Sequence, residues 1–214
     1  MRGSHDLAPR TAHAYARSPL STMKAARAID ARTTCLLGAG LLVSALACAD
    51  AHAQGTFALG SANFRDGAKV AAPQVLNDNG CTGANRSPQL TWRNPPAGTR
   101  SYAVTVFDPD APGPGWWHWA VANIPARVSA LPENASASGA LKKLGALEAR
   151  NDFGGAGYGG PCPPPGKPHR YVVTVYALGV DKLALAPVGP AMMFDHEIHG
   201  AALGSAKITV MYGR

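Results

Sequence analysis

Two segments of the chain carry the side chains best suited to bind a small charged ligand. They are residues 108–119 (DPDAPGPGWWHW) and residues 157–171 (GYGGPCPPPGKPHRY). Their candidate ligand-binding side chains are Asp108, Asp110, His118, His169 and Tyr171. Both segments are rich in proline, which fixes φ, and in glycine, which lets backbone N–H groups approach a ligand closely. Rigid loops with free amides and two histidines predict a site for a small anion.

The aspartates and histidines also have simpler interpretations. On an extended chain Asp108 and Asp110 would share one face about 7 Å apart, where they could act as an acid/base pair. In a proline-rich turn, however, an aspartate commonly accepts hydrogen bonds from neighbouring backbone N–H groups. A histidine between tryptophans, such as His118, is commonly a hydrogen-bonded residue of the core. The residues alone leave these alternatives open.

Alternating apolar residues predict the elements that position the two segments. The expected strands are residues 56–59, 69–70, 88–92, 101–108, 117–124, 171–178 and 206–212. Residues 101–108 are apolar on both faces, which is typical of a central strand, and they end at Asp108. Residues 190–203 have helical spacing. The pattern alone predicts a mainly β protein, a β-sandwich.

Two further expectations concern segments around the strands. Strict alternation along residues 117–124 would turn His118 away from both Trp117 and Trp119. Residues 127–149 are weakly patterned, and we expect them to form a surface excursion with one short strand near Ala146.

Several motifs resemble those of a known family. DPDAP followed by W-x-H, and GGP-x-PP followed by PHRY, look like the signature segments of the phosphatidylethanolamine-binding protein family, also called Raf-kinase-inhibitor-like proteins. The bacterial branch carries three further motifs, which stand here at residues 80–88 (GCTGANRSP), 151–154 (NDFG) and 207–214, ending in YGR. The resemblance covers essentially the whole chain from about Thr56 onwards.

The resemblance implies a large central antiparallel sheet packed on a smaller sheet, with a C-terminal helix beside the ligand pocket. It implies a pocket for phosphate or a phospholipid headgroup such as phosphoethanolamine, in which Asp108 either orients an imidazole or contacts the ligand amine. The implied ligand-binding residues are Asp108, Asp110, His118, Gly159, Gly160, Pro161, His169 and Tyr171. The glycines and the proline of this set would hold the anion through backbone amides. Arg170 alternates with Tyr171 and is expected to face away, in a structural ion pair.

The first 53 residues are predicted to be absent from the mature protein. Residues 23–53 contain a basic stretch, an apolar run and an A-x-A cleavage site before Gln54, the pattern of a cleaved secretory signal peptide. Residues 1–22 lack that pattern and are interpreted as a disordered upstream extension. A lipoprotein acylated at Cys48 is the alternative. We expect a periplasmic or secreted protein with one domain at residues 54–214 and no transmembrane segment.

Without the leader two cysteines remain, Cys81 and Cys162. Each lies in a signature segment rich in glycine or proline. In an oxidising compartment such a pair is expected to form a disulfide. Two buried thiols or a reactive cysteine are the alternatives.

Composition and spacing argue against several classes of protein. Six of the 20 Lys and Arg residues and three of the 13 Asp and Glu residues lie in the first 53 positions, so the formal charge falls from +7 to +4 without them. No basic cluster interleaved with aromatic residues remains, and nucleic-acid binding is not expected. The spacing from His196 to His199 is H-E-x-H, which differs from the H-E-x-x-H of zinc peptidases. We therefore expect no metal and no cofactor.

These observations favour a binding or regulatory protein over an enzyme. A peptidase inhibitor or another protein-interaction module, with a protein as partner, is the second interpretation. The third is a hydrolase that uses the Asp and His residues of the pocket, although no nucleophile or metal cage is identifiable. Homodimerisation occurs in the bacterial proteins that this chain resembles, and no residue of the sequence decides it.

Overall fold

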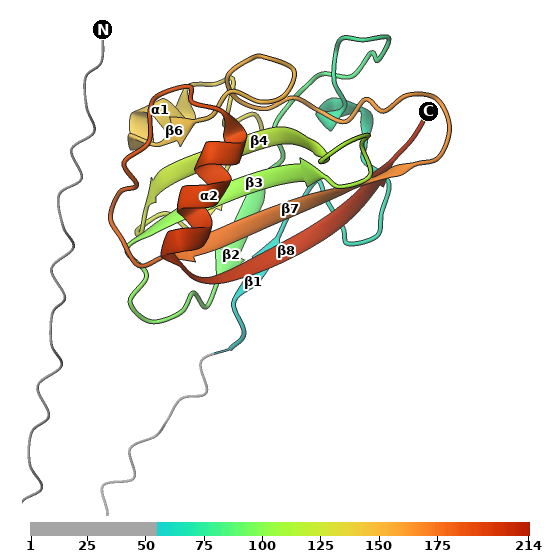
Figure 1. Cartoon of the computed structure of the whole chain (residues 1–214). Helices are drawn as coiled ribbons and strands as arrows, with labels where there is room; N and C mark the ends of the chain where they lie inside the picture. The colour runs from blue at the N-terminus through green and yellow to red at the C-terminus, as the bar shows by residue number, and fades with distance from the viewer. Residues whose placement is uncertain (1–54) are drawn as a thin grey trace, which may run out of the picture. The chain divides into compact units, whose positions relative to one another are not determined.

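A five-stranded antiparallel sheet is the frame of the molecule (Figure 1). The computed structural model describes residues 55–214, so the predicted extension (1–22), signal peptide (23–53) and acylated Cys48 lie outside the described residues. The strand order of the large sheet is β6-β4-β3-β7-β8. Its strands are β3 (Ser101–Asp108), β4 (Trp116–Pro125), β6 (Leu147–Glu148), β7 (His169–Leu178) and β8 (Ala202–Tyr212).

A smaller sheet and a few helices complete the described part of the chain. The smaller sheet has the order β1-β2-β5 and is also antiparallel. Its strands are β1 (Ala58–Gly60), β2 (Leu90–Arg93) and β5 (Ala130–Leu131). The helices are the 3-10 helix η1 (Ala72–Gln74), α1 (Ala140–Leu144) and α2 (Ala191–Ala201). Figure 1 shows β1 and β2 behind the large sheet and α2 in front of it, which confirms the predicted two-sheet, mainly β fold.

Apolar side chains alternate between two cores, one on each face of the large sheet. Tyr102 and Val104 of β3 belong to the core between the two sheets, whereas Ala103 belongs to the core beneath α2. Phe194 and Ile198 of α2 are fully buried in that second core. Because β3 is covered on both faces, it is the central strand that its composition predicted.

The antiparallel arrangement brings three strand ends together. Asp108 is the last residue of β3, and its register partner Trp116 is the first residue of β4. His169 is the first residue of β7, which pairs with β3 on the other side. Neighbouring antiparallel strands run in opposite directions, so the C-terminal end of β3 lies beside the N-terminal ends of β4 and β7. Both signature segments therefore meet at one end of the sheet.

Two segments differ from what the sequence predicted. Lys69 forms an isolated bridge to Met211 rather than a strand, and the N–H of Val70 donates to the carbonyl of Met211 at 2.8 Å. The short strand expected near Ala146 is β6, whereas the rest of residues 127–149 forms β5 and α1 rather than a surface excursion, and Leu141 of α1 is buried. These elements have two to five residues each, too short for a hydrophobic period to register in the sequence.

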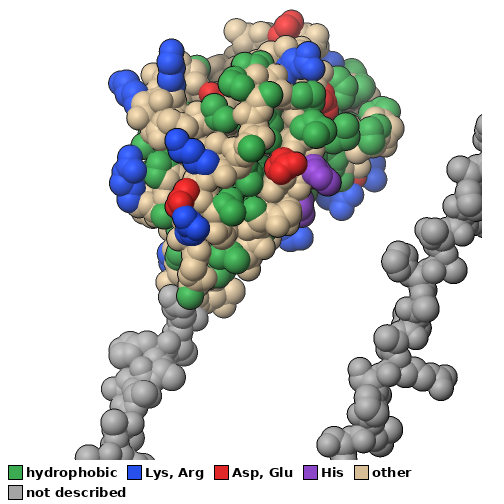
Figure 2. Space-filling model, turned by 60° about the vertical axis from the view of Figure 1, so that its left-hand side comes forward, with side chains coloured by type: hydrophobic (Ala, Val, Ile, Leu, Met, Phe, Trp, Pro, Cys, Tyr) green, Lys and Arg blue, Asp and Glu red, His purple; other side chains and the backbone are tan. Residues whose placement is uncertain are grey.

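The surface carries no dominant basic patch on the face shown in Figure 2. Lys and Arg side chains there are separated by uncharged and hydrophobic groups. In the part of the chain that the structure describes, no helix is long and apolar enough to span a membrane.

Candidate functional site

A β-bulge sets the direction of the His118 side chain. Val106 of β3 pairs with Trp119, and the next residue, Phe107, pairs with Trp117. His118 therefore has no partner in β3 and is an extra residue in β4. A bulge interrupts the alternation of side chains along a strand. Trp119 consequently points into the core between the sheets and Trp117 packs on the core beneath α2. The expectation that His118 faces away from both indoles is wrong, because its ring packs edge-on against Tyr171 of the first core, with centroids 5.0 Å apart.

A cavity of about 570 Å³ lies at the end of the sheet where the signature segments meet. Four of the predicted ligand-binding residues line it, namely Asp108, His118, His169 and Tyr171. The other lining residues are Asn79, Ala111, Pro112, Trp116, Asp152, Phe153, Cys162, Pro163, Pro164, Pro165 and Arg214. No residue of α2 is among them. The helix does not lie beside this cavity as expected, because it packs over β4 and β7 on the opposite core.

Asp108 holds His169 in a fixed orientation. The aspartate is only 3% exposed, and its Oδ2 accepts a hydrogen bond from Nδ1 of His169 at 2.7 Å. Its Oδ1 accepts from the backbone N–H groups of Asp110 at 2.8 Å and Ala111 at 3.1 Å. The carboxylate therefore closes the proline-rich turn and orients a histidine at the same time. Because Nδ1 is committed to Asp108, Nε2 is the ring nitrogen of His169 that can meet a ligand.

His118 is buried with a defined proton position. It is 2% exposed, and its Nδ1 donates to the carbonyl oxygen of Gly159 at 2.7 Å. A carbonyl can only accept, so the neutral ring carries its proton on Nδ1 and a lone pair on Nε2. Burial lowers the pKa of His118 below its ordinary value, since desolvation disfavours the imidazolium. The hydrogen bond to Gly159 and the charge of Asp108 act in the opposite direction without cancelling that effect.

Two buried donors at the cavity have no hydrogen-bond partner among the described residues. They are the hydroxyl of Tyr171 and Nε1 of Trp116. Leaving such a group unsatisfied costs about 1–3 kcal/mol. Burial also raises the pKa of Tyr171, so its hydroxyl keeps the proton and remains a donor. Both residues line the cavity, so a ligand acceptor that reaches these atoms would satisfy them.

Asp110, which was predicted as a ligand-binding residue, is not among the residues that line the cavity. Its carboxylate forms a bidentate ion pair with Arg170, with Nε to Oδ2 at 2.9 Å and Nη2 to Oδ1 at 2.6 Å. The backbone N–H of Arg170 also donates to Oδ2 at 2.8 Å. These hydrogen bonds hold the pKa of Asp110 well below its usual range. The pair ties the turn after β3 to the start of β7 and confirms the predicted structural ion pair of Arg170.

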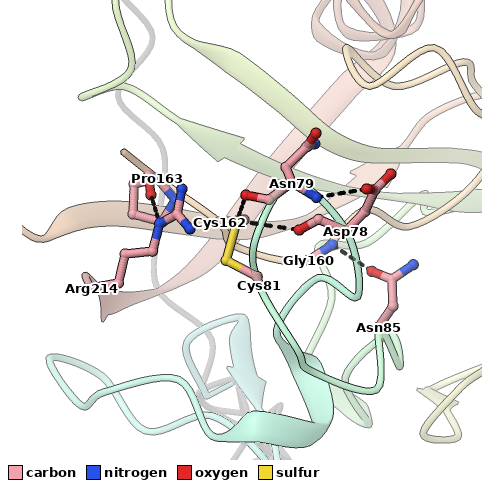
Figure 3. The surroundings of a disulfide bond; sticks show 8 residues. All are labelled: Asp78, Asn79, Cys81, Asn85, Gly160, Cys162, Pro163 and Arg214. Atoms are coloured by element: carbon pink, nitrogen blue, oxygen red, sulfur yellow. Dashed lines mark hydrogen bonds between the residues drawn. A yellow bond between two sulfur atoms is a disulfide. The ribbon is translucent and has the colours of Figure 1, made fainter. Parts of the chain in front are cut away.

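Gly159, Gly160 and Pro161 support the site from outside the cavity. The N–H of Gly159 donates to the carbonyl of His118 at 2.8 Å, and the N–H of Gly160 donates to Oδ1 of Asn85 at 2.7 Å (Figure 3). Pro161 has no N–H to offer. A Cβ on Gly160 would lie 2.3 Å from the carbonyl oxygen of Gln74, so the close approach of two backbones explains this glycine. In this structure the two amides that were predicted to hold an anion therefore donate within the protein.

A disulfide joins the proline-rich wall of the cavity to the loop at residues 78–81. Cys81 and Cys162 are bonded, with Cα atoms 6.0 Å apart, which confirms the predicted bridge (Figure 3). The Sγ atom of Cys162 lies 3.6 Å from the carbonyl oxygen of Asn79. A disulfide sulfur carries no proton, so this is a packing contact. The bridge thus fixes two cavity residues, Asn79 and Cys162, relative to each other.

The cavity lining carries charges of both signs. Arg214 supplies its permanent positive charge, and its Nε donates to the carbonyl of Pro163 at 2.7 Å (Figure 3). Asp108 and Asp152 supply two carboxylates. One oxygen of Asp152 accepts from the backbone N–H of Trp117 at 2.7 Å. This arrangement suits a ligand that carries both a negative and a positive group.

Sequence reasoning did not include Asp152, Phe153 and Arg214 among the site residues. Phe153 packs edge-on against both Trp116 and His118, each at a centroid distance of 5.3 Å. The signal that could have found these residues is the set of motifs behind the resemblance, since NDFG contains two of them and the terminal YGR contains the third.

In the acidic and histidine-rich stretch of α2, His199 forms a hydrogen bond within the helix. Nδ1 of His199 donates to the carbonyl of Asp195 at 2.9 Å. Across residues 55–214 no three His, Cys, Asp or Glu side chains are grouped so that they could hold a metal ion.

The described chain is a two-sheet β protein with a partly polar cavity at one end of its larger sheet. Residues 60–213 match the sequence model of the family described as phosphatidylethanolamine-binding protein. The chain is 43% identical over 159 residues to the UPF0098 protein YbcL of Escherichia coli K12, covering 73% of this chain and 87% of that protein. The chain belongs to the phosphatidylethanolamine-binding protein family.

Two further similarities place the chain among its relatives. The crystal structure of E. coli YbcL, described as a new member of the mammalian PEBP family, superposes with a TM-score of 0.71 at 42% identity, covering 74% of this chain and 98% of that one. A putative lipoprotein of Mycobacterium tuberculosis H37Rv, LppC, is 36% identical over 151 residues, covering 70% of this chain and 69% of that protein.

Proposed function

We propose that the protein binds small phosphorylated ligands, phosphate or a headgroup such as phosphoethanolamine, in the cavity at the end of the large sheet. The observation that carries this proposal is the pair of buried, unpartnered donors, the Tyr171 hydroxyl and Trp116 Nε1, beside His118 and His169. Phosphate oxygens accept several hydrogen bonds at once. A donor with neither solvent nor a protein partner is stabilised by any acceptor that reaches it.

The mixed charges of the lining support a zwitterionic headgroup. Arg214 provides a positive charge for the phosphate. Asp152 uses one carboxylate oxygen to accept from Trp117, which leaves the second oxygen for an ammonium group. Asp108 already accepts three hydrogen bonds and orients His169, so its part in ligand binding is to position that ring. Phosphoethanolamine presents the phosphate and the ammonium that this lining requires.

Binding is favoured over catalysis by the side chains that line the cavity. No serine or threonine is among them, and Cys162 is engaged in the disulfide. Burial keeps Tyr171 protonated, so the usual activated nucleophiles do not stand beside a base. The pairing of Asp108 with His169 is the observation that favours hydrolysis as a second function, because an oriented imidazole can activate water. Release of phosphate from phosphoethanolamine, lost in His169→Asn, would support that function.

We place this function outside the cytoplasm. The leader pattern of residues 23–53 and the Cys81–Cys162 disulfide are both typical of exported proteins. The relative LppC is itself described as a putative lipoprotein, which supports export to the cell envelope.

Calorimetric titration of the purified, oxidised protein tests the proposal. The ligands are phosphate, phosphoethanolamine and a short-chain phosphatidylethanolamine. His118→Ala and His169→Ala are expected to weaken binding by about tenfold or more, since hydrogen bonds to a charged ligand contribute about 1.5–3 kcal/mol. His196→Ala, at an exposed position of α2, is the matched control and should bind as the wild type does. Thermal unfolding verifies each fold. No saturable binding of any ligand to the wild type would contradict the proposal.

A further inference from the structure

The histidines of the cavity are placed to accept protons rather than to donate them. Nδ1 of His118 donates to the carbonyl of Gly159, and Nδ1 of His169 donates to the carboxylate of Asp108, both at 2.7 Å. Neither a carbonyl nor a carboxylate can donate, so each Nδ1 holds its ring's proton. In a neutral ring Nε2 therefore carries a lone pair and can accept a hydrogen bond. The cavity then combines this acceptor with the buried donors of Tyr171 and Trp116.

The surroundings of His118 favour its neutral form. The charged and titratable groups that line the cavity together with His118 are Asp108, Asp152, His169, Tyr171 and Arg214. The carboxylates of Asp108 and Asp152 favour an imidazolium. Burial outweighs the carboxylates, and the pKa of His118 lies below its ordinary value. Nε2 of His118 is accordingly an acceptor at neutral pH.

The charges of the lining also disfavour a doubly negative ligand. Among the Asp, Glu, Lys and Arg side chains of the lining, the carboxylates of Asp108 and Asp152 stand against the single guanidinium of Arg214. A dianion would add two negative charges to a lining whose carboxylates already outnumber its guanidinium by one, whereas a singly charged phosphate with a nearby ammonium adds no net charge.

We propose that the cavity selects phosphate monoesters in their singly protonated form, with Nε2 of His118 accepting the P–OH proton. This inference rests on the proposed function and narrows its ligand class. The other phosphate oxygens accept from the Tyr171 hydroxyl and from Nε1 of Trp116. A diester, including the phosphate of an intact phospholipid, has no P–OH and sets an oxygen lone pair against the lone pair of Nε2. A dianion does the same until it takes up a proton.

A monoester and a diester with the same headgroup give the direct test. Phosphoethanolamine and glycerophosphoethanolamine are titrated into the purified wild-type protein from about pH 5 to pH 8, a range that spans the second pKa of a phosphate monoester, about 6. We expect the diester to bind about tenfold more weakly at the acid end, since one hydrogen bond to a charged group is lost. The affinity for the monoester should fall about tenfold per pH unit above its second pKa.

The proton can be assigned to the ligand with a second compound. In 2-aminoethylphosphonate a P–C bond replaces the ester bond, and the second proton is held to higher pH. If the ligand supplies the proton, the midpoint of the affinity loss moves upward with this compound. The same midpoint for both compounds would assign the titration to a histidine and overturn the inference. Equal binding of monoester and diester would also overturn it while leaving the proposed function intact, whereas no binding of any phosphate compound would overturn both.

A variant of His118 isolates the acceptor itself. His118→Asn keeps an N–H that can donate to Gly159 but removes the acceptor at the position of Nε2. Its affinity for phosphoethanolamine should fall about tenfold, to the level of the diester, while binding of the diester stays unchanged. His196→Asn on α2 is the matched control. An unchanged ratio of the two affinities in a folded His118→Asn protein would overturn the inference, and if this variant does not fold, the wild-type comparison of the two ligands decides.

Discussion

The hydroxyl of Tyr171 allows a test in which stability and binding change in opposite directions. Tyr171→Phe removes only the hydroxyl, from a side chain that is 1% exposed and whose oxygen has no partner among the described residues. A buried unsatisfied polar group costs about 1–3 kcal/mol. Its removal should therefore raise the free energy of unfolding of the ligand-free protein by about 1 kcal/mol. For a domain of this size the melting temperature should rise by about 2–4 °C.

Tyr158→Phe is the matched control for this change. Tyr158 is buried in the same core, but its hydroxyl donates to the carbonyl of Gln74 at 2.8 Å. Removing it leaves that carbonyl without its partner, which should lower the free energy of unfolding by about 1 kcal/mol. Each variant loses only a phenolic oxygen relative to the wild type, so changes in ring burial and side-chain entropy cancel when the two variants are compared.

Urea denaturation with and without phosphoethanolamine measures both effects. The stabilised Tyr171→Phe protein should bind phosphoethanolamine about tenfold to a hundredfold more weakly, because it lacks one hydrogen bond to a charged ligand. Tyr158→Phe should bind it as the wild type does. Equal destabilisation of the two variants would show that the hydroxyl of Tyr171 already has a partner in the free protein, and the reasoning would be refuted.

Three further predictions concern the frame of the site. Replacing both Cys81 and Cys162 with serine should lower the free energy of unfolding by on the order of 4 kcal/mol, because the bridge spans 81 residues of sequence. Denaturation of the reduced wild-type protein should show the same loss of unfolding free energy. His118 has a lowered pKa in the folded state, so its stabilising contribution is complete above about pH 6.5 and is lost as the pH falls, by up to about 1.4 kcal/mol per pH unit. Denaturation from pH 7 to pH 5 should show that slope, and His118→Asn should reduce it. Asp110→Asn breaks an exposed ion pair, so it should lower the free energy of unfolding by less than about 1 kcal/mol and leave ligand affinity unchanged. Asp108→Asn releases His169 and should weaken ligand binding, measured by calorimetry, about tenfold.

Hydrophobic periodicity was sufficient to predict the frame of the fold. Residues 101–108 are apolar on both faces because β3 lies between β4 and β7 and is covered by a core on each side. Once such a central strand ends at Asp108, antiparallel neighbours must begin beside it. The meeting of His118, His169 and Asp108 at one cavity follows from that arrangement.

Local side-chain and backbone pairing could not be predicted from the same pattern. The bulge at His118 adds one residue without changing the composition of β4, so alternation alone gave the wrong face. The partner of Asp110 is Arg170, which is 60 residues away in sequence. The resemblance to a family identified both aspartates as site residues, and only the geometry separates Asp108, which lines the cavity, from Asp110, which ties two elements together.

Gly159 affects the ligand through His118 rather than by direct contact. Its N–H donates to the carbonyl of His118 at 2.8 Å, and its carbonyl accepts from Nδ1 of the same residue at 2.7 Å. These two hydrogen bonds fix the ring and its tautomer, so a displacement of this segment should change the chemistry of the cavity. Gly160→Ala imposes such a displacement, because its Cβ would lie 2.3 Å from the carbonyl of Gln74.

We expect Gly160→Ala to loosen the hydrogen bond between Gly159 and His118 and to expose the ring. The pKa of His118 should then rise toward its ordinary value, which an NMR titration of the imidazole measures. Gly155→Ala is the control in the same loop, since nothing lies within 4 Å of its added Cβ. If Gly160→Ala left the His118 titration unchanged while weakening phosphoethanolamine binding, the loop would act on the ligand by another route, and the role assigned to Gly159 would be wrong.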